Sequence, residues 1–358
     1  MTITMKRVLM VTGDVNLMNV TDPQVPFARV KDTLRQADVL FGNLECCFYE
    51  PAGGHALERE GFYAPLASAQ ALDIGGYHAV GNANNVNYGE EAIRSSLRRL
   101  DEIGIPYTGA GVNGGAARAP AVVTHDGLRF GFLQRTSVYW PTGHEAGDDS
   151  PGVAVLTGHT AYEPMLHTRR AGVPPANRPG LPPVILTWAD AKSLAEFTGD
   201  LRALRTRADI VVASHHWGLF EDVLDYQVEI AHAAIDAGAD VVMGHGPHDA
   251  CAVEMYRGQP IFYGLGSFSF HTGHGGRAHG DWVGMLARLT FDDSALVEVA
   301  FSMVRHDEGN ATYVCDPHLD KEAVEQIVRR CDKLGTTLTI SGGELIVAST
   351  GSPRDEAR

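Results

Sequence analysis

Short apolar runs that alternate with helical patterns constrain the fold of this chain more than any other feature of its sequence. Apolar runs that end in polar residues predict strands, and the amphipathic stretches between them predict helices. The first three predicted strands lie at residues 7–15, 38–45 and 77–85. The helical stretches that follow them are 25–37, 64–76 and 89–105. This alternation favours an α/β protein with a largely parallel sheet.

The second half of the chain repeats the alternation after a hairpin and an irregular stretch. Residues 121–136 predict a β-hairpin with His125, Asp126 and Gly127 at its turn. Residues 140–185 are rich in Pro and Gly and predict an ordered insertion or lid. The later predicted strands are 209–218, 240–248, 259–270 and 284–306, and the later helices are 191–208, 226–239 and 320–335. We expect a single domain over residues 1–358, with a β/helix extension from about residue 284.

Charge and composition narrow the classes of partner. The formal net charge is −15 and Lys and Arg form no cluster, which disfavours nucleic acid as a partner. No apolar stretch approaches the roughly 20 residues of a membrane span, and the first apolar run is too short for a signal peptide. The five cysteines form neither a CxxC pair nor a disulfide framework. We therefore expect a cytoplasmic protein that acts on a small molecule, away from membranes.

Residue types that bind metals gather where the predicted strands end. They are Asp14, Glu45, Asn82, Asn84, Asn85, His215, His216, His245 and His248. Loops at the carboxyl ends of strands in an α/β sheet converge on one crevice. Carboxylate, amide and imidazole ligands together suit Mn, Fe or Zn. The set is larger than one ion needs, which favours two ions whose bridging water is the nucleophile.

Seven stretches of the sequence resemble one known family. In chain order they are "VTGDVNLM", "ADVLFGNLE", "NANNVNYG", "YTGAGVN", "VVASHHWG", "DAGADVVMGHGPH" and "GQPIFYGLGSFSF", and they extend from residue 8 to about residue 270. They resemble the capsule and poly-γ-glutamate synthesis (CapA) family, a branch of the calcineurin-like metallophosphoesterases. The resemblance implies a four-layer αββα sandwich with a metal centre at the sheet ends.

The resemblance also implies which residues hold the metals. Asp14 matches the acid of the first strand, Glu45 the acid of "NLE", and His216 the histidine of "HWG". His245 and His248 match the closing "GHGPH" motif, and Asn85 is the second asparagine of "NN". The implied ligand set is therefore Asp14, Glu45, Asn85, His216, His245 and His248.

One departure from the family pattern concerns the proton donor. The family usually has a histidine after the two asparagines, and this chain has Val86 there. We consider His274 and His215 as replacement general acids, because imidazole transfers protons near neutral pH. His274 stands in "FHTGHGGRAHGDW", which predicts either a surface loop or a substrate loop. We expect substrate contacts from Asn84, Arg135, His271 and Arg277; for Arg135, the alternative is a structural ion pair.

The sequence thus predicts a metal-dependent hydrolase that cleaves a small amide-type (C–N) or related carbonyl substrate through a metal-bound hydroxide. The family's link to γ-glutamyl amides and the loss of the expected histidine favour this bond. One alternative is a phosphoesterase. A second alternative is a non-catalytic accessory protein of capsule or poly-γ-glutamate synthesis. The sequence predicts neither the oligomeric state nor which metal is bound.

Overall fold

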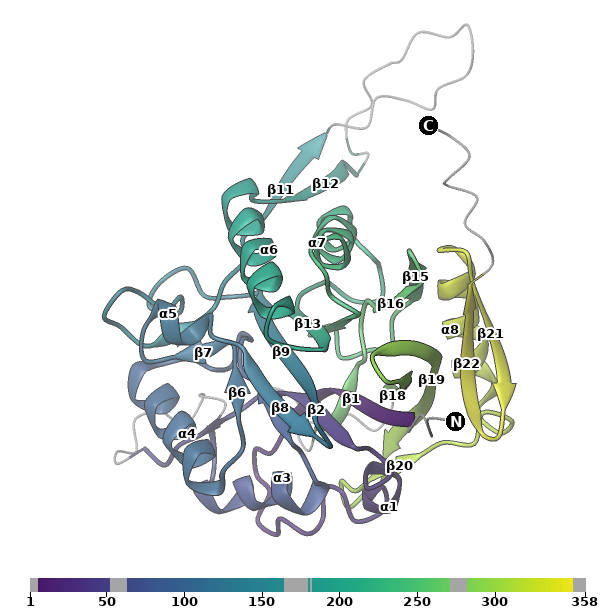
Figure 1. The fold of residues 1–358 in the computed structure, drawn as a ribbon, viewed down its shortest axis with the longest axis horizontal. Coiled ribbons are helices and arrows are strands. Elements are labelled where there is room, and N and C mark those ends of the chain that lie inside the picture. The colour runs from purple at the N-terminus through teal and green to yellow at the C-terminus, as the bar shows by residue number, and fades with distance from the viewer. Residues whose placement is uncertain (1–5, 52–62, 164–179, 181, 271–281, 350–358) are drawn as a thin grey trace, which may run out of the picture.

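The computed structural model describes residues 6–51, 63–163, 180, 182–270 and 282–349. A ten-stranded sheet and a six-stranded sheet form most of it (Figure 1). The strands of the larger sheet are β21 (Thr336–Ser341), β22 (Glu344–Ser349), β19 (Ala295–His306), β18 (Gly284–Asp292), β1 (Lys6–Asn16), β2 (Val39–Leu44), β5 (Ala79–Gly81) and β6 (Tyr107–Thr108), with β17 (Ser267–Phe270) beside β1 and β20 (Thr312–Val314) beside β19.

The smaller sheet has a parallel centre and an antiparallel strand on each edge. Its strands are β15 (Val253–Tyr256), β16 (Gln259–Phe262), β14 (Val241–His245), β13 (Ile210–His216), β9 (Leu128–Thr136) and β8 (Ala121–His125). Strands β9, β13, β14 and β16 run parallel to one another, as β1, β2, β5 and β6 do in the larger sheet. Parallel strands in both sheets place several carboxyl ends at one edge of the molecule, where ligands bind in such folds.

The inner faces of the two sheets pack on each other. The shared core includes Val11 and Phe41 of the larger sheet with Phe132 and Val212 of the smaller one. The rings of Phe41 and Phe132 stack with centroids 4.3 Å apart. Apolar residues on both inner faces are therefore removed from water, which is the main force that holds two layers together.

Helices cover the outer faces of both sheets. On the larger sheet lie α1 (Lys31–Leu34), α3 (Gln70–Gly75) and α4 (Glu90–Ile103). On the smaller sheet lie α6 (Ala191–Arg205) and α7 (Asp225–Asp236), and α8 (Lys321–Asp332) packs near β15 and β21. The order helix, sheet, sheet, helix confirms the predicted αββα sandwich.

Several predicted elements are found and others are shorter than predicted. The hairpin at 121–136 is confirmed as β8 and β9. The predicted helix at 25–37 is wrong over most of its length, because only Lys31–Leu34 is α-helical. Pro26 lacks an amide hydrogen, and the chain before Lys31 forms successive turns instead. The stretch at 64–76 divides into a 3₁₀ helix, Leu66–Ala69, and α3.

Short strands occupy the remaining connections. They are β3 (Cys47–Phe48), β4 (Tyr63–Ala64), β7 (Ala110–Gly111), β10 (Gly152–Val153), β11 (Gly158–Glu163) and β12 (Val184–Ala189), with a short helix α5 (Gly114–Ala117) beside β7. Strands β11 and β12 pair into a ribbon that projects from the body of the molecule (Figure 1).

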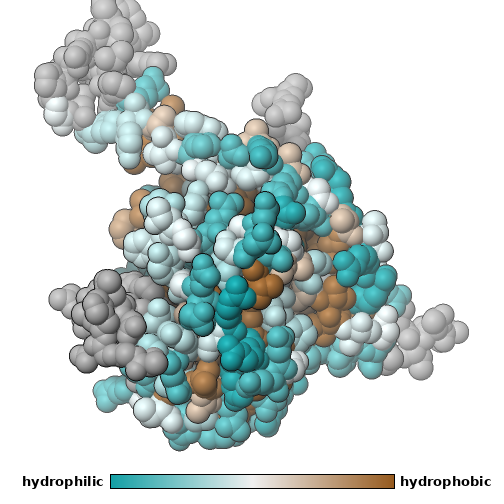
Figure 2. All heavy atoms as spheres, turned by 90° about the vertical axis from the view of Figure 1, so that its left-hand side faces the viewer, coloured by the Kyte–Doolittle hydropathy of each residue, from teal (hydrophilic) through white to brown (hydrophobic). Residues whose placement is uncertain are grey.

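The face of the molecule shown in Figure 2 is largely hydrophilic, with hydrophobic residues in separate patches. Among the described residues, no helix is both long enough and apolar enough to span a bilayer.

Candidate metal centre

A close approach of two backbones fixes the carboxyl end of β1. The amide of Asp14 donates a hydrogen bond to the carbonyl of Gly266 over 2.9 Å. A Cβ atom at Gly13 would lie 1.9 Å from that carbonyl oxygen, so only glycine fits there. The bond orients Asp14 inward near the carboxyl end of β1, where the predicted strand at 7–15 had placed it.

The buried carboxylate of Asp14 faces a different histidine with each of its oxygens. Oδ1 accepts a hydrogen bond from Asn43 Nδ2 (2.8 Å) and lies 3.6 Å from His245 Nδ1. Oδ2 lies 3.1 Å from His248 Nδ1 and 3.3 Å from the amide nitrogen of Gly246. Burial acts to raise the pKa of Asp14, but the hydrogen bond and charge of His248, with the other histidines, lower it overall. Asp14 is therefore ionised and stands between two groups of donor atoms.

The first group of donor atoms comes from Asp14, His216 and His245, which end β1, β13 and β14. Nδ1 of His216 lies 3.0 Å from Nδ1 of His245, and Nε2 of His216 lies 2.8 Å from Oδ1 of Asn85. Burial lowers the pKa of His216 far below its ordinary value and that of His245 to about 3. Both rings are therefore neutral at pH 7 and offer nitrogen lone pairs.

The second group of donor atoms comes from Asp14, Glu45 and His248. His248 has a left-handed backbone (φ 64°), and its ring stacks on Trp282 with centroids 4.7 Å apart. Nε2 of His248 lies 3.9 Å from Oε1 of Glu45. Glu45 is buried, and its Oε2 has no hydrogen-bond partner among the described residues. Burial, then the charge of Asp14, raise the pKa of Glu45 well above its ordinary value.

These residues fit two divalent cations that share Asp14. An unpartnered buried carboxylate oxygen costs free energy unless a cation or a proton satisfies it. Donor atoms that each lie about 2.1 Å from one ion are roughly 3 Å apart from their neighbours, close to the 3.0 Å between the Nδ1 atoms of His216 and His245. Carboxylate, amide and imidazole donors suit Mn, Fe or Zn. The donor set thus agrees with the ions expected from the sequence, and the identity of the ligands stays a prediction.

A second layer of polar side chains holds this centre, and the sequence interpretation missed most of it. Asn43 Oδ1 accepts hydrogen bonds from Gln134 Nε2 (2.9 Å) and Asn84 Nδ2 (3.1 Å). Gln134 also contacts Nε2 of His245 over 3.0 Å, and Ser214 Oγ lies 2.9 Å from the same nitrogen. The signal for these residues was their position. Asn43, Asn84 and Ser214 lie within two residues of a predicted ligand, and Gln134 lies two residues before the end of the buried strand β9.

The side chain of Asn84 has a structural role, because both of its polar atoms are hydrogen-bonded within the protein. Its Nδ2 donates to Asn43 and to the carbonyl of Leu44 (2.9 Å), while its Oδ1 accepts from the amides of Val86 and Asn87. The predicted substrate contact from Asn84 is thus replaced by a role in shaping the loop that carries Asn85. Asn82, the first asparagine of the motif, is buried as well, and its side chain has no hydrogen-bond partner among the described residues.

The structure does not bring His215 to the centre. Successive side chains of a strand point to opposite faces, so His215 faces away from His216. Its Nε2 contacts Ser137 Oγ over 2.9 Å, and its ring lies against Trp217, with centroids 4.7 Å apart. This geometry does not support the predicted part of His215 as general acid.

Arg135 is also turned away from the centre. It is buried, pairs with Asp200 of α6 and donates to the carbonyl of Gln134 over 2.9 Å. Its guanidinium carbon lies 5.6 Å from the ring centre of Phe197. The structure therefore supports the structural ion pair, which was the alternative for Arg135, and not the substrate contact.

Three predicted residues cannot be placed, and one unpredicted histidine lies close to the centre. His271, His274 and Arg277 lie outside the described residues.

Val86 is buried and supplies no proton. His144 lies in the stretch 140–185, and its fully buried ring contacts Asn87 O through Nε2 over 3.0 Å. Burial lowers the pKa of His144 to about 4, so it is a neutral structural residue.

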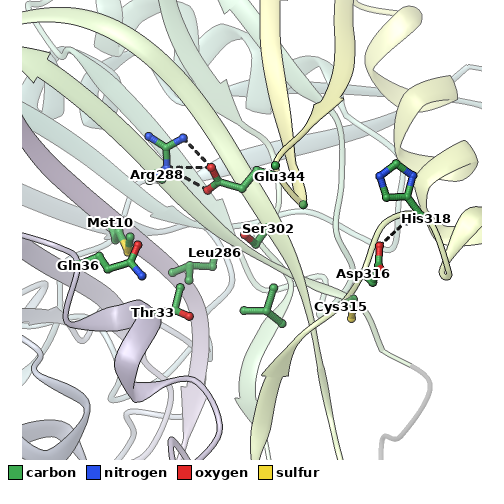
Figure 3. Close-up of a pocket in the computed structure, with 13 residues that line it drawn as sticks. Met10, Thr33, Gln36, Leu286, Arg288, Ser302, Cys315, Asp316, His318 and Glu344 are labelled. Atoms are coloured by element: carbon green, nitrogen blue, oxygen red, sulfur yellow. Dashed lines mark hydrogen bonds and ion pairs between the residues drawn. The ribbon is translucent and has the colours of Figure 1, made fainter.

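A surface pocket lies apart from this centre. It measures about 570 Å³ and includes Met10, Leu286, Arg288 and Cys315. Figure 3 shows Arg288 at this pocket, joined to Glu344 by hydrogen bonds. None of its lining residues belongs to the donor groups around Asp14, so it is not the candidate site.

Comparisons with known proteins agree with the sequence motifs. A family profile described as "Bacterial capsule synthesis protein PGA_cap" matches residues 7–272. An uncharacterized protein of Sinorhizobium fredii is 28% identical over 284 residues, which are 68% of this chain and 61% of that protein. The capsule biosynthesis protein CapA of Bacillus anthracis is 25% identical over 254 residues, 69% of this chain and 54% of the relative.

Two further comparisons concern an accessory protein and a solved structure. A probable polyglutamine synthesis accessory protein of Mycobacterium tuberculosis is 30% identical over 198 residues, 53% of this chain and 44% of that protein. The matches cover less than two thirds of the length of these relatives. A crystal structure described as a novel phosphatase from Mycoplasma pneumoniae aligns with a TM-score of 0.47 and 9% identity, over 84% of this chain and 94% of that one.

Proposed function

Because this chain belongs to the bacterial capsule synthesis protein PGA_cap family, we propose that it is a metal-dependent hydrolase with a dinuclear centre. The observation that carries the proposal is the position of Asp14, whose two carboxylate oxygens face two separate groups of donor atoms. A dinuclear site needs one such shared ligand. Two buried histidines, the partly buried His248 and the buried acid Glu45 surround this one carboxylate, and burying so many polar groups costs free energy unless they are paired or bind a cation.

The proposed roles of the residues follow from their places. Asp14, His216 and His245 would hold one ion, and Asp14, Glu45 and His248 would hold the other. Asn85, whose Oδ1 lies 2.8 Å from Nε2 of His216, would be a further ligand at this centre. When bound, two such ions supply Lewis acidity and an activated water as nucleophile. The chain itself keeps His216 and His245 neutral by burial and keeps Asp14 ionised through its contact with His248. Asn43, Gln134 and Ser214 hold these ligands in place.

We propose a carbonyl carbon bonded to nitrogen as the reacting group, as in a small amide. Phosphoryl transfer commonly relies on cationic side chains that hold the equatorial oxygens. The arginine that sequence reasoning assigned to substrate, Arg135, is buried and bound to Asp200, so it does not hold a phosphoryl group at the centre. A phosphoesterase with only its metal ions as electrophiles is the second candidate within enzymes.

A non-catalytic accessory role is the third candidate. It draws support from the name of the mycobacterial relative and from Val86, which fills the position of the expected proton donor. A hydrolase and an accessory protein differ in one measurable property: only the hydrolase turns over a substrate when the purified protein is loaded with metal.

Hydrolysis assays on metal-loaded protein test the proposal. Mn- and Zn-loaded chain should hydrolyse a small amide from a panel of γ-glutamyl amides, cyclic amides, lactones and phosphoesters. Asp14→Asn should abolish both metal binding and hydrolysis, and Asp32→Asn, at an exposed acid of α1, should change neither. Turnover of phosphoesters alone would support the second candidate, and about two bound ions without any turnover would support the accessory role.

A further inference from the structure

Two aromatic side chains stand exposed beside the candidate metal centre. Tyr88 is 40% exposed and Trp140 is 51% exposed, and their rings meet edge to face with centroids 6.2 Å apart. Large aromatic rings bury much apolar area when they bind a partner. An exposed pair of such rings is therefore a candidate binding surface. The pair comes from two segments that are far apart in the sequence, the loop after β5 and the segment after β9.

Hydrogen bonds hold both rings by their polar ends. Nε1 of Trp140 donates to the carbonyl of Asn85 over 2.9 Å, and the hydroxyl of Tyr88 donates to the carbonyl of Thr142 over 3.3 Å. What remains exposed is therefore mainly the carbon face of each ring. Rings whose polar ends are already bonded lose little further conformational freedom when they bind a ligand.

The backbone beneath the pair is fixed by His144. Its Nδ1 accepts a hydrogen bond from the amide of Trp140 over 2.9 Å, and its Nε2 donates to the carbonyl of Asn87 over 3.0 Å. The ring of His144 also meets Tyr88 edge to face, with centroids 5.3 Å apart. The buried imidazole thereby joins the segment of Trp140 to the loop of Tyr88.

The pair adjoins the centre through Asn85. The carbonyl of Asn85 accepts from Trp140, and its side-chain oxygen lies 2.8 Å from Nε2 of His216. One residue thus connects the exposed aromatic surface with a predicted metal ligand.

We propose that Tyr88 and Trp140 form a binding surface for an aromatic ring of the substrate. The proposal rests on the proposed function in that this group belongs to the molecule that reacts at the centre. Flat rings gain offset-stacked or edge contacts with such a pair beyond simple burial of area. A saturated ring of equal size gains burial alone. The pair therefore selects substrates by the planarity of the group next to the reacting carbonyl.

Binding of two matched amides tests this surface without any turnover. Benzamide and cyclohexanecarboxamide share the amide and the ring size and differ in planarity. Calorimetric titration of the full chain, with and without Mn²⁺, should show benzamide binding roughly 3- to 10-fold more tightly. Trp140→Ala and Tyr88→Leu should remove this preference, and Trp140→Phe should keep most of it. Trp188→Ala is the matched control, because Trp188 is 45% exposed and belongs to the projecting β11–β12 ribbon.

The outcomes separate this proposal from the proposed function. A preference for benzamide that persists without Mn²⁺ and disappears in Trp140→Ala supports the surface even if the chain hydrolyses nothing. Equal affinities for the two amides, no measurable binding of benzamide, or a preference that survives in Tyr88→Leu would overturn it, even for an active hydrolase. Tyr88→Leu decides the result if Trp140→Ala does not fold, as judged by its thermal unfolding.

Discussion

The Nδ1 atoms of His216 and His245 lie 3.0 Å apart in a buried site. Both rings are neutral, so two ring nitrogens that approach this closely must share either a proton or a cation. We expect a divalent cation to stabilise the fold, since it binds the folded chain and not the unfolded one. Mn²⁺ or Zn²⁺ at 100 times its dissociation constant should add about 2.7 kcal/mol to the free energy of unfolding.

Thermal unfolding with and without metal measures this effect. His245→Gln should lose most of the metal-dependent increase in the melting temperature, because it removes one nitrogen of the pair. His318→Gln, at an exposed histidine on the loop before α8, should keep the full increase. An equal response in His245→Gln and the unchanged chain would contradict the metal site.

The shared position of Asp14 predicts unequal losses of metal. Asp14→Asn removes charge from both groups of donor atoms, whereas Glu45→Gln alters one of them. We expect about two ions per chain in the unchanged protein, about one in Glu45→Gln and fewer than one in Asp14→Asn. Elemental analysis of dialysed protein gives these numbers, and identical loss in the two variants would argue against a shared ligand.

Ser214 should act on metal affinity through His245. Its Oγ lies 2.9 Å from Nε2 of His245 and orients the ring so that Nδ1 faces Asp14. Outer partners of ligand histidines typically contribute 10- to 100-fold to metal affinity. Ser214→Ala should weaken Zn²⁺ binding by roughly that factor in a chelator competition assay. Ser137→Ala is the control, because its hydroxyl contacts His215 on the opposite face of β13.

The raised pKa of Glu45 predicts how the metal-free chain responds to pH. Burial and the charge of Asp14 hold the folded carboxyl protonated above its ordinary pKa of 4.5. The folded state then binds more protons than the unfolded one, so its stability falls as pH rises from 4.5 towards the folded pKa. Glu45→Gln cannot ionise and should escape this loss. Urea unfolding of metal-free protein across this range should therefore show the variant gaining stability relative to the unchanged chain with rising pH, and a constant difference would oppose the assignment.

The ion pair of Arg135 predicts a loss of stability without a loss of metal. Asp200→Asn leaves the buried guanidinium of Arg135 without its charged partner, and the loss of a hydrogen bond to a charged group costs roughly 2 kcal/mol. Because Arg135 does not face the centre, the ion content of folded protein should stay unchanged. Urea unfolding and elemental analysis of the same sample measure both quantities. A loss of metal with unchanged stability would restore Arg135 to the site.

The alternation of strands and helices predicts the α/β class, and the resemblance to a known family implied the αββα sandwich. The grouping of residues around Asp14 was predicted for a separate physical reason. The carboxyl ends of parallel strands in an α/β fold converge on one crevice. Residues of metal-binding types at several of these ends therefore imply a common site. Asp14, Glu45 and His245 were found this way. The orientation of neighbouring side chains was harder to predict, because it depends on the register of a strand: His215 and His216 are adjacent in sequence and face opposite sides of β13.

Contacts made by irregular segments could not be read from any periodic pattern. Trp140 and His144 lie in a stretch whose Pro and Gly content indicated only an insertion. Their hydrogen bonds reach Asn85 and Asn87 across more than fifty positions. Such contacts depend on the packed structure of both segments, and no local propensity encodes them.

The pairing of β1 with the late hairpin sets an order of events during synthesis. Strand β1 lies between β2 and β18, and Lys6 is paired with Asp292. A nascent chain therefore cannot complete the pairing of β1 within the larger sheet until residue 292 has left the ribosome. The hydrogen bond from Asp14 likewise cannot form until Gly266 has been synthesised. Until then one edge of β1 is unpaired and can pair with another chain. The nascent chain is therefore most prone to aggregation before the metal centre is assembled.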